Sequence, residues 1–289
     1  MAVFSCTNYQ SGYFNAYQEV VNRNDVDVLV HLGDWIYEYG VGEFGYDSTV
    51  HRPHDPTTEA ITLDDYRRRH AQYKADPQSI RMLQQFPLIA VWDDHEVADN
   101  AYKDGAVNHQ SATEGDWYLS LHSAKRAYFE WMPVRKPDPN GDSMRIYRKF
   151  AFGKLINLDM MDTRLQGRTI QEDQSASDFN DTARAMMDYG ERGWLANEFN
   201  NSTAKWNIAG QQVMMAPLTA FGSIVNNDQW DGYPAERNRF YADLQQNSSK
   251  NFVVLSGDLH SALANDLPLS GYSSSNRSAS ASVEFLTPS

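Results

Sequence analysis

Short apolar segments alternate with longer amphipathic segments along this chain of 289 residues. Six apolar segments have the length and residue types of buried β-strands, namely residues 2–5, 26–32, 88–92, 154–160, 206–210 and 252–255. Helical spacing of apolar residues predicts four helices, over 12–23, 62–77, 114–131 and 178–199. Because strands that alternate with helices are typical of layered α/β domains, we expect an α/β fold.

Three stretches lack either periodicity and are predicted to be irregular, namely residues 40–60, 138–143 and 272–282. None is long enough to link two separate domains, so we predict one domain over residues 1–289. Strand-like sequence at both ends of the chain predicts that it is a piece of a longer protein.

The composition excludes several classes of protein. The formal charge of −13 disfavours binding to a nucleic-acid duplex, and the arginines at 67–69, close to Asp64 and Asp65, are predicted to lie on a solvated helix face. No apolar run approaches the roughly 20 residues of a membrane-spanning helix. A single cysteine, Cys6, excludes an intrachain disulfide.

Residues able to bind a metal or move a proton follow most of the predicted strands. They are Cys6 after the first strand, Asp34, Tyr37 and Glu38 after the second, Asp93, Asp94, His95 and Glu96 after the third, Asp162 and Arg164 after the fourth, and Asp258 and His260 after the sixth. Ligands of open α/β sheets bind at the carboxyl ends of the strands. If the strands share one direction, these residues lie along one edge.

Crowded carboxylates repel one another, and polyvalent metal ions convert that repulsion into coordination. Thiolate and phenolate ligands suit a trivalent or transition metal, whereas carboxylates suit a hard ion such as Ca²⁺. The pattern therefore predicts a hydrolytic site with two or three metals. Taken singly, each residue has a simpler explanation: Cys6 as a buried apolar side chain, Asp34 as a helix cap, and Asp162 with Arg164 as an ion pair.

At these residues the sequence resembles the PhoD-type alkaline phosphatase/phosphodiesterase family of the metallophosphoesterase superfamily. The resemblance extends over almost the whole chain and rests on an ordered set of motifs: Ser5-Cys6, His31-Leu-Gly-Asp34-Trp-Ile-Tyr37-Glu38, Trp92-Asp-Asp-His-Glu96, Asp162-Thr-Arg164, Gly210-Gln-Gln212 and Ser256-Gly-Asp258-Leu-His260. Gly-Asp alone has no specificity, but this order of motifs is highly specific.

The resemblance implies a two-sheet αββα sandwich that binds Fe³⁺ and Ca²⁺. It implies that the iron ligands are Cys6, Asp34, Tyr37 and His260, with Asp34 bridging to a calcium side formed with Asp94 and Asp258. His95 matches the histidine that contacts the phosphate and protonates the leaving group. Arg164 is the corresponding candidate for a phosphate clamp, since its planar fork suits phosphate oxygens.

The activity that the resemblance implies is hydrolysis of phosphate monoesters or diesters by a metal-activated hydroxide. The substrate is expected to be a small molecule, a nucleotide, a phospholipid or a teichoic acid, and the location periplasmic or extracellular. The family usually has a β-rich domain before the catalytic part and a helix after it. Residues 1–289 are thus expected to be a catalytic domain truncated at both ends.

Two other functions are compatible with parts of the sequence. A secreted Ca²⁺-binding or glycan-binding module fits the acidic, aromatic-rich composition, but it needs carboxylates grouped in one loop, which the chain lacks. A hydrolase with Cys6 as nucleophile predicts sensitivity to thiol alkylation without metal dependence, and it leaves Asp34, Asp94 and Asp258 without a role.

Overall fold

The computed structural model describes residues 1–136, 144–247, 250–268 and 280–288. These residues form two compact units, Met1–Ile146 and Tyr147–Pro288. The assignment of the whole chain to one domain stays a prediction.

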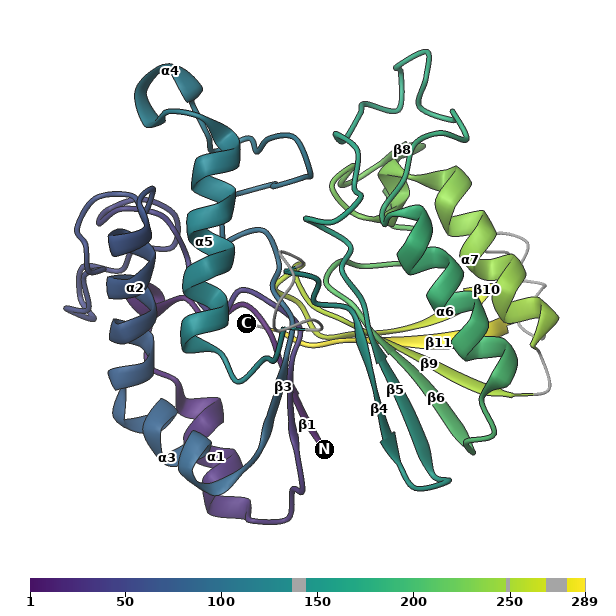
Figure 1. Ribbon diagram of the computed structural model, residues 1–289, viewed down its shortest axis with the longest axis horizontal. Helices are drawn as coiled ribbons and strands as arrows, with labels where there is room; N and C mark the ends of the chain where they lie inside the picture. Colours follow the sequence, from purple (N-terminus) through teal and green to yellow (C-terminus); the bar gives the residue numbers. More distant parts are fainter. Residues whose placement is uncertain (137–143, 248–249, 269–279, 289) are drawn as a thin grey trace. The chain divides into compact units, whose positions relative to one another are not determined.

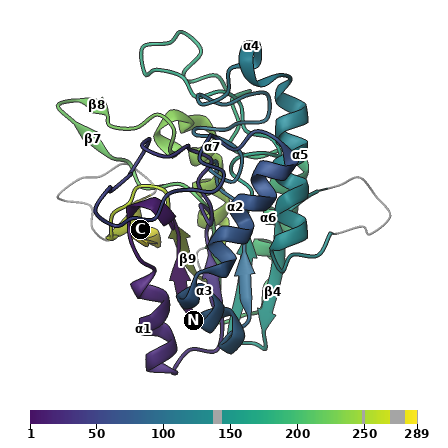
Figure 2. The same cartoon turned by 90° about the vertical axis from the view of Figure 1, so that its left-hand side faces the viewer.

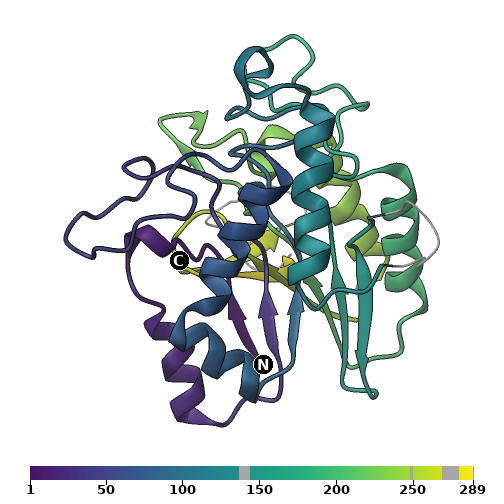
Figure 3. The same ribbon diagram turned by 60° about the vertical axis from the view of Figure 1, so that its left-hand side comes forward.

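The first unit is built on a parallel sheet of three strands in the order β1-β2-β3. The strands are β1 (Ala2–Phe4), β2 (Leu29–His31) and β3 (Leu88–Ala90), and the helices are α1 (Asn15–Arg23), α2 (Leu63–Ala75), α3 (Pro77–Gln85), α4 (Ser111–Glu114) and α5 (Trp117–Trp131). Figure 3 shows the three strands pointing the same way, with α1, α2, α3 and α5 over one face of the sheet. Their carboxyl ends therefore lie at one edge, as predicted.

Side-chain caps explain where the helices of this unit begin. Thr62 and Asp65 form a capping box at the start of α2, and Asp76 caps α3, whose first residue is Pro77. The helix predicted over 114–131 begins only at Trp117, because Gly115 has φ +90° and Asp116 caps α5; Glu114 is the last residue of the short α4.

The second unit contains a sheet of six strands in the order β10-β11-β9-β6-β5-β4. The strands are β4 (Arg148–Phe152), β5 (Ile156–Met160), β6 (Trp206–Gly210), β9 (Asn251–Ser256), β10 (Leu263–Pro268) and β11 (Ser280–Leu286). The four inner strands are parallel, and each outer strand is antiparallel to its neighbour. The carboxyl ends of β5, β6 and β9 thus share an edge.

Helices α6 (Tyr189–Asn201) and α7 (Pro234–Gln246) cover one face of this sheet (Figure 1). Aromatic side chains join them to it: the ring of Phe199 in α6 lies 4.8 Å from that of Phe252 in β9 and 5.7 Å from that of Phe240 in α7. A short hairpin of β7 (Thr219–Ala220) and β8 (Ser223–Ile224) projects from the unit (Figure 2). A 3₁₀ turn (Trp230–Gly232) precedes α7.

The structure corrects several predicted elements of the second unit. The helix predicted over 178–199 begins only at Tyr189, where the side chain of Asp188 accepts a hydrogen bond from the backbone of Glu191. Helix α7 and strands β4, β10 and β11 were not predicted.

Residues 40–60 lack helix and strand, as predicted. The irregular stretch 138–143 and residues 272–279 of the third stretch lie outside the described residues, and residues 280–282 belong to β11.

The fold is therefore mixed α/β with several sheets, which confirms the predicted class at that level. Among the described residues, no helix has the length and apolar character needed to cross a bilayer.

Asp159 in β5 provides a test of the packing in the second unit. Its carboxyl group is buried and accepts a 2.8 Å hydrogen bond from Asn157. Burial raises its pKa from 3.8 to about 7, with Glu198 adding to the shift and Lys149 opposing it. Because the folded state then binds more protons than the unfolded state, stability falls as the pH rises from about 4 to about 7.

We expect Asp159→Asn to remove this pH dependence. Above pH 7 the variant should be more stable than the wild type, by up to about 4 kcal/mol for a shift of about three pKa units. Near pH 4 the two proteins should be equally stable. Urea unfolding of both proteins at pH 4, 6 and 8 measures this difference. A constant difference across that range would show that Asp159 ionises normally in the folded state.

Candidate metal centre

In the first unit, the predicted ligands Cys6 and Asp34 follow β1 and β2. The strands remain hydrogen-bonded past their ends, since the backbone N–H of Cys6 donates to Gly33 O (3.1 Å) and that of Thr7 donates to Asp34 O (2.8 Å). This pairing holds Cys6 and Asp34 next to each other at the carboxyl edge of the sheet.

The backbone at the predicted ligands is strained. In the first unit Cys6 has φ 57° and Asp34 φ 56°, and in the second unit Asp258 has φ 65° and His260 φ 55°. A side chain in this left-handed region costs about 1–2 kcal/mol. Such strain clusters at functional sites, where the surrounding structure imposes it. Four of the six predicted metal ligands share this property.

Gly33 allows the ends of β2 and β3 to approach each other closely. It has φ +119°, and a Cβ atom there would lie 2.3 Å from Cβ and 2.5 Å from the backbone N of Asp93. No side chain fits this contact. Glycine therefore lets the Asp34 segment lie directly against the segment that contains Asp94.

The buried carboxylate of Glu96 joins these two segments. Its Oε2 accepts hydrogen bonds from the backbone N–H of Asp34 (2.9 Å) and Asp93 (2.7 Å), and its Oε1 accepts one from Trp35 (2.5 Å). Burial raises the pKa of Glu96 to about 7, although its backbone donors lower it. Glu96 was recognised as part of a motif but was not predicted as a site residue.

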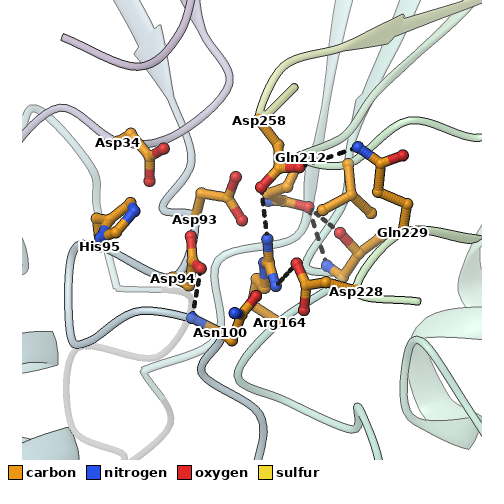
Figure 4. A network of polar contacts seen from close by, with 12 residues as sticks. Asp34, Asp93, Asp94, His95, Asn100, Arg164, Gln212, Asp228, Gln229 and Asp258 are labelled. Carbon is orange, nitrogen blue, oxygen red and sulfur yellow. Dashed lines mark hydrogen bonds and ion pairs between the residues drawn. The ribbon is translucent and has the colours of Figure 1, made fainter. Parts of the chain in front are cut away.

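Asp34, Asp94 and His95 form a cluster suited to a metal. Each offers one ligand atom, the three atoms lie within 4.8 Å of one another, and all three residues are buried. The Tyr37 hydroxyl donates to Asp34 Oδ2 (3.3 Å). The backbone N–H of Asn100 donates to Asp94 Oδ2 (2.6 Å; Figure 4). Such hydrogen bonds orient carboxylates for metal binding.

A second buried carboxylate orients His95. Its Nδ1 lies 2.7 Å from Oε2 of Glu38, which is fully buried. The imidazole ring lies among aromatic rings, with the centroids of Tyr37 at 4.2 Å and Phe44 at 6.2 Å. Burial lowers the pKa of His95, but the carboxylates of Glu38, Asp94 and Asp34 outweigh it and raise the pKa well above its usual value.

The second unit has its own carboxylate network around Arg164, whose side chain is fully buried (Figure 4). Its Nη1 donates to Asp228 Oδ2 (2.6 Å) and its Nη2 to Asp258 Oδ1 (2.9 Å). Gln229 donates to the other oxygen of Asp258 (3.2 Å), and Arg168 donates to Asp228 Oδ1 (2.5 Å). These contacts make Arg164 an orienting partner of Asp258, and a direct contact of Arg164 with phosphate stays a prediction.

Arg164 forms its ion pairs with Asp228 and Asp258 and not with Asp162, its neighbour in the sequence. Asp162 does not pair with the Arg164 guanidinium. Its Oδ1 accepts hydrogen bonds from the backbone N–H of Arg164 (3.1 Å) and Leu165 (2.8 Å). Asp228 was missed because it follows no predicted strand and no motif contains it.

Comparison with known proteins identifies the family. The sequence model described as PhoD-like phosphatase matches residues 1–289. The chain belongs to the PhoD-like phosphatase family. It is 36% identical over 278 residues to alkaline phosphatase D of Bacillus subtilis (strain 168). The aligned region covers 92% of this chain and 46% of that protein.

A solved structure titled "Structure of PhoD" matches 100% of this chain and 56% of its own, with 36% identity and a TM-score of 0.89. The chain thus spans about half the length of the relatives that it matches. The agreement with a PhoD structure confirms the family that the order of motifs indicated.

The donor atoms at the strand ends of the first unit fit a metal centre. Burial, reinforced by the charges of Asp34 and Cys6, raises the pKa of the Tyr37 phenol well above its usual value. A cation is therefore needed to stabilise its phenolate. Asp34 and Asp94 supply carboxylate oxygens beside it.

Proposed function

We propose that this PhoD-like phosphatase hydrolyses phosphate monoesters, diesters or both in a metal-dependent reaction. The observation that supports it most directly is that the buried carboxylates of Asp34 and Asp94, two proposed metal ligands, lie within 4.8 Å of each other and of a nitrogen of His95 at the ends of parallel strands. Substrate candidates are small-molecule esters, nucleotides, phospholipids and teichoic acids. The location we propose is periplasmic or extracellular, in line with the exported family that the sequence resembles.

The cofactors that we propose are Fe³⁺ and Ca²⁺. Cys6, Asp34, Tyr37 and His260 would hold the iron, and Asp94 and Asp258, together with Asp34, the calcium. The mixture of thiol, phenol and carboxylates supports this division, because soft and phenolate donors suit iron whereas carboxylates suit calcium. When bound, such metals lower the pKa of water and neutralise charge on the phosphoryl oxygens.

The two sheets would then form the αββα sandwich of the metallophosphoesterase superfamily, as one catalytic domain over residues 1–289. The match to a PhoD structure along the whole chain supports this arrangement.

His95 is the proposed general acid. Its Nδ1 proton is held by Glu38 at 2.7 Å, so the proton for the departing alkoxide comes from Nε2. Arg164 orients Asp258 through Nη2 and offsets negative charge on the phosphate. Neither step requires a nucleophilic serine.

The test of this function is to combine metal analysis of the purified protein with a visible spectrum and with hydrolysis assays of aryl phosphate monoesters and diesters. We expect iron and calcium, a tyrosinate-to-iron absorption band that Tyr37→Phe shifts or removes, and loss of all hydrolysis on chelation. Hydrolysis that survives chelation but is blocked by thiol alkylation would instead support Cys6 as nucleophile. Protein without hydrolysis or metal after reconstitution would contradict the proposal.

The role of His95 predicts a dependence on the leaving group. His95→Asn should reduce kcat for alkyl phosphates by about 10²–10³-fold, because these alkoxides need a proton to depart. It should reduce kcat far less for nitrophenyl phosphate, whose leaving group is stable as an anion. The matched control is His122→Asn, at an exposed position of α5. Equal losses for both substrates would show that His95 is not the acid.

A further inference from the structure

Arg69 departs from the position that the sequence predicts for it. Its neighbours in α2 are solvated as expected: Arg67 pairs with Glu130, and Arg68 pairs with Asp55, all with exposed side chains. Arg69 is instead fully buried. The prediction of a solvated face is therefore wrong for Arg69, which lies on the inner face of the helix.

Among the described residues, the groups that accept hydrogen bonds from the buried guanidinium of Arg69 are all backbone carbonyls. Its Nη1 donates to the carbonyls of Tyr37 and Tyr39 (2.9 Å for the latter), its Nη2 to those of Pro56 (2.9 Å) and Thr58 (3.2 Å), and its Nε to that of Asp55 (3.2 Å). Within the parts of the chain that the structure describes, Arg69 forms no ion pair with a carboxylate. Burial lowers its pKa, whereas the nearby acidic groups of Tyr73, Glu38 and Asp55 oppose that shift.

These five carbonyls belong to the two ends of one long loop. Tyr37 and Tyr39 lie where the chain leaves the end of β2, and residues 55–58 lie where it returns toward α2. The two legs also bond to each other, from Val41 N to Thr57 O (2.9 Å) and from Ala60 N to Glu38 O (2.9 Å). Arg69 thus fixes both legs of the loop to α2 at one point.

The outgoing leg contains two residues of the candidate site. Glu38 lies between the two carbonyls that Nη1 binds, and its carboxylate holds Nδ1 of His95. Tyr37, whose own carbonyl is bound, directs its hydroxyl to Asp34. The backbone that Arg69 restrains is therefore the backbone that sets the direction of these two side chains.

We propose that Arg69 is a positioning residue for the hydrolytic reaction. By holding residues 37–39, it keeps Glu38 against His95 and Tyr37 against Asp34. This inference rests on the proposed function. A lysine does not reproduce the effect, because its ammonium group is a compact charge without the planar fork that reaches both legs.

The test compares Arg69→Lys with Arg67→Lys, which makes the same change on the exposed face of the same helix. Displacement of catalytic groups by about 1 Å reduces rates by about 100-fold, so we expect a loss of that order in kcat for an alkyl phosphate, with KM little changed. Nitrophenyl phosphate should be affected less, since it does not need the proton of His95. Arg67→Lys should behave as the wild type with both substrates.

Hydrogen–deuterium exchange of the same proteins measures the restraint independently of activity. In Arg69→Lys, amides of the two legs, such as those of Val41 and Ala60, should exchange faster, whereas those of α1 should not change. A wild-type exchange pattern and kcat in Arg69→Lys would overturn the proposal. So would failure of this variant to fold, which would assign Arg69 to stability alone. If the wild type hydrolysed no phosphate ester, the proposed function would fail, but faster exchange would still support the restraint.

Discussion

Replacing Asp34 with asparagine is expected to reduce hydrolysis of phosphate esters by a factor on the order of 10³. Asp34 is held in place by hydrogen bonds of its backbone and of its side chain. Its backbone O accepts from Thr7, its backbone N–H donates to Glu96, and its Oδ2 accepts from Tyr37. Asparagine has nearly the same shape and keeps the backbone contacts, so the change removes the negative charge and replaces one acceptor oxygen by an NH₂ group.

Metal content of the Asp34→Asn protein should fall together with kcat/KM, because the proposed site then lacks its bridging carboxylate. The measurement is kcat/KM for nitrophenyl phosphate, with iron and calcium analysis of the same samples and circular dichroism to confirm folding. Asp64→Asn, at an exposed position of α2, is the control for removal of one charge. A folded Asp34→Asn protein with full activity and metal content would refute the role of Asp34.

Adding one methyl group at Gly33 is expected to be the most damaging small substitution in the first unit. The Cβ of Gly33→Ala would lie 2.3 Å from Cβ of Asp93, and the residue would have to keep φ near +119°. Overpacking against a neighbouring backbone and an unfavourable φ together cost about 2–5 kcal/mol. Relief of the contact separates the Asp34 and Asp94 segments, so metal binding should weaken as well.

Urea unfolding measures the stability of Gly33→Ala, and titration with Ca²⁺ measures its metal affinity. The matched control is Gly12→Ala in the same unit, where no atom lies within 4 Å of the new Cβ and φ is 172°. Gly12→Ala should leave the free energy of unfolding close to that of the wild type. If both variants unfolded at the same urea concentration, the close approach of Gly33 and Asp93 would not be a constraint on the fold.

The sequence predicted the strands that position the site because these strands are short, apolar and followed by polar residues. Parallel pairing of β1, β2 and β3, and of β5, β6 and β9, then brings the strand ends of each sheet to one edge. The motif order identified the family. Those parts of the prediction depend on hydropathy and residue type, which are visible along the chain.

The inner face of α2 was not predicted because its buried residues are not apolar. Tyr66, Arg69, His70 and Tyr73 have helical spacing and are all buried, yet their hydropathy resembles that of a solvated surface. Inside the protein, the hydrogen bonds of Arg69 are accepted by backbone carbonyls of the loop that precedes α2. Hydropathy patterns do not indicate which backbone carbonyls will lie next to a given side chain in the folded protein.

Glu38 and Glu96 illustrate the same difficulty within recognised motifs. Both were seen beside predicted ligands, but their roles depend on groups far away in sequence. Glu38 accepts from His95 and from the backbone of Asp99, and Glu96 accepts from the backbone of Asp34. Only the folded structure shows that these two carboxylates orient neighbouring site residues through hydrogen bonds.

The strand order of the second unit has a consequence for synthesis on the ribosome. Strand β11 lies between β9 and β10, although β10 precedes it in the chain. β10 therefore has no strand to pair with until residues 280–286 have emerged and docked beside β9. Glu284 of β11 also accepts hydrogen bonds from the backbone of Met215 and Ala216, which follow β6. The sheet that supports Asp258 is thus completed only after translation has passed β11, and a nascent chain paused earlier would expose the edge of β9.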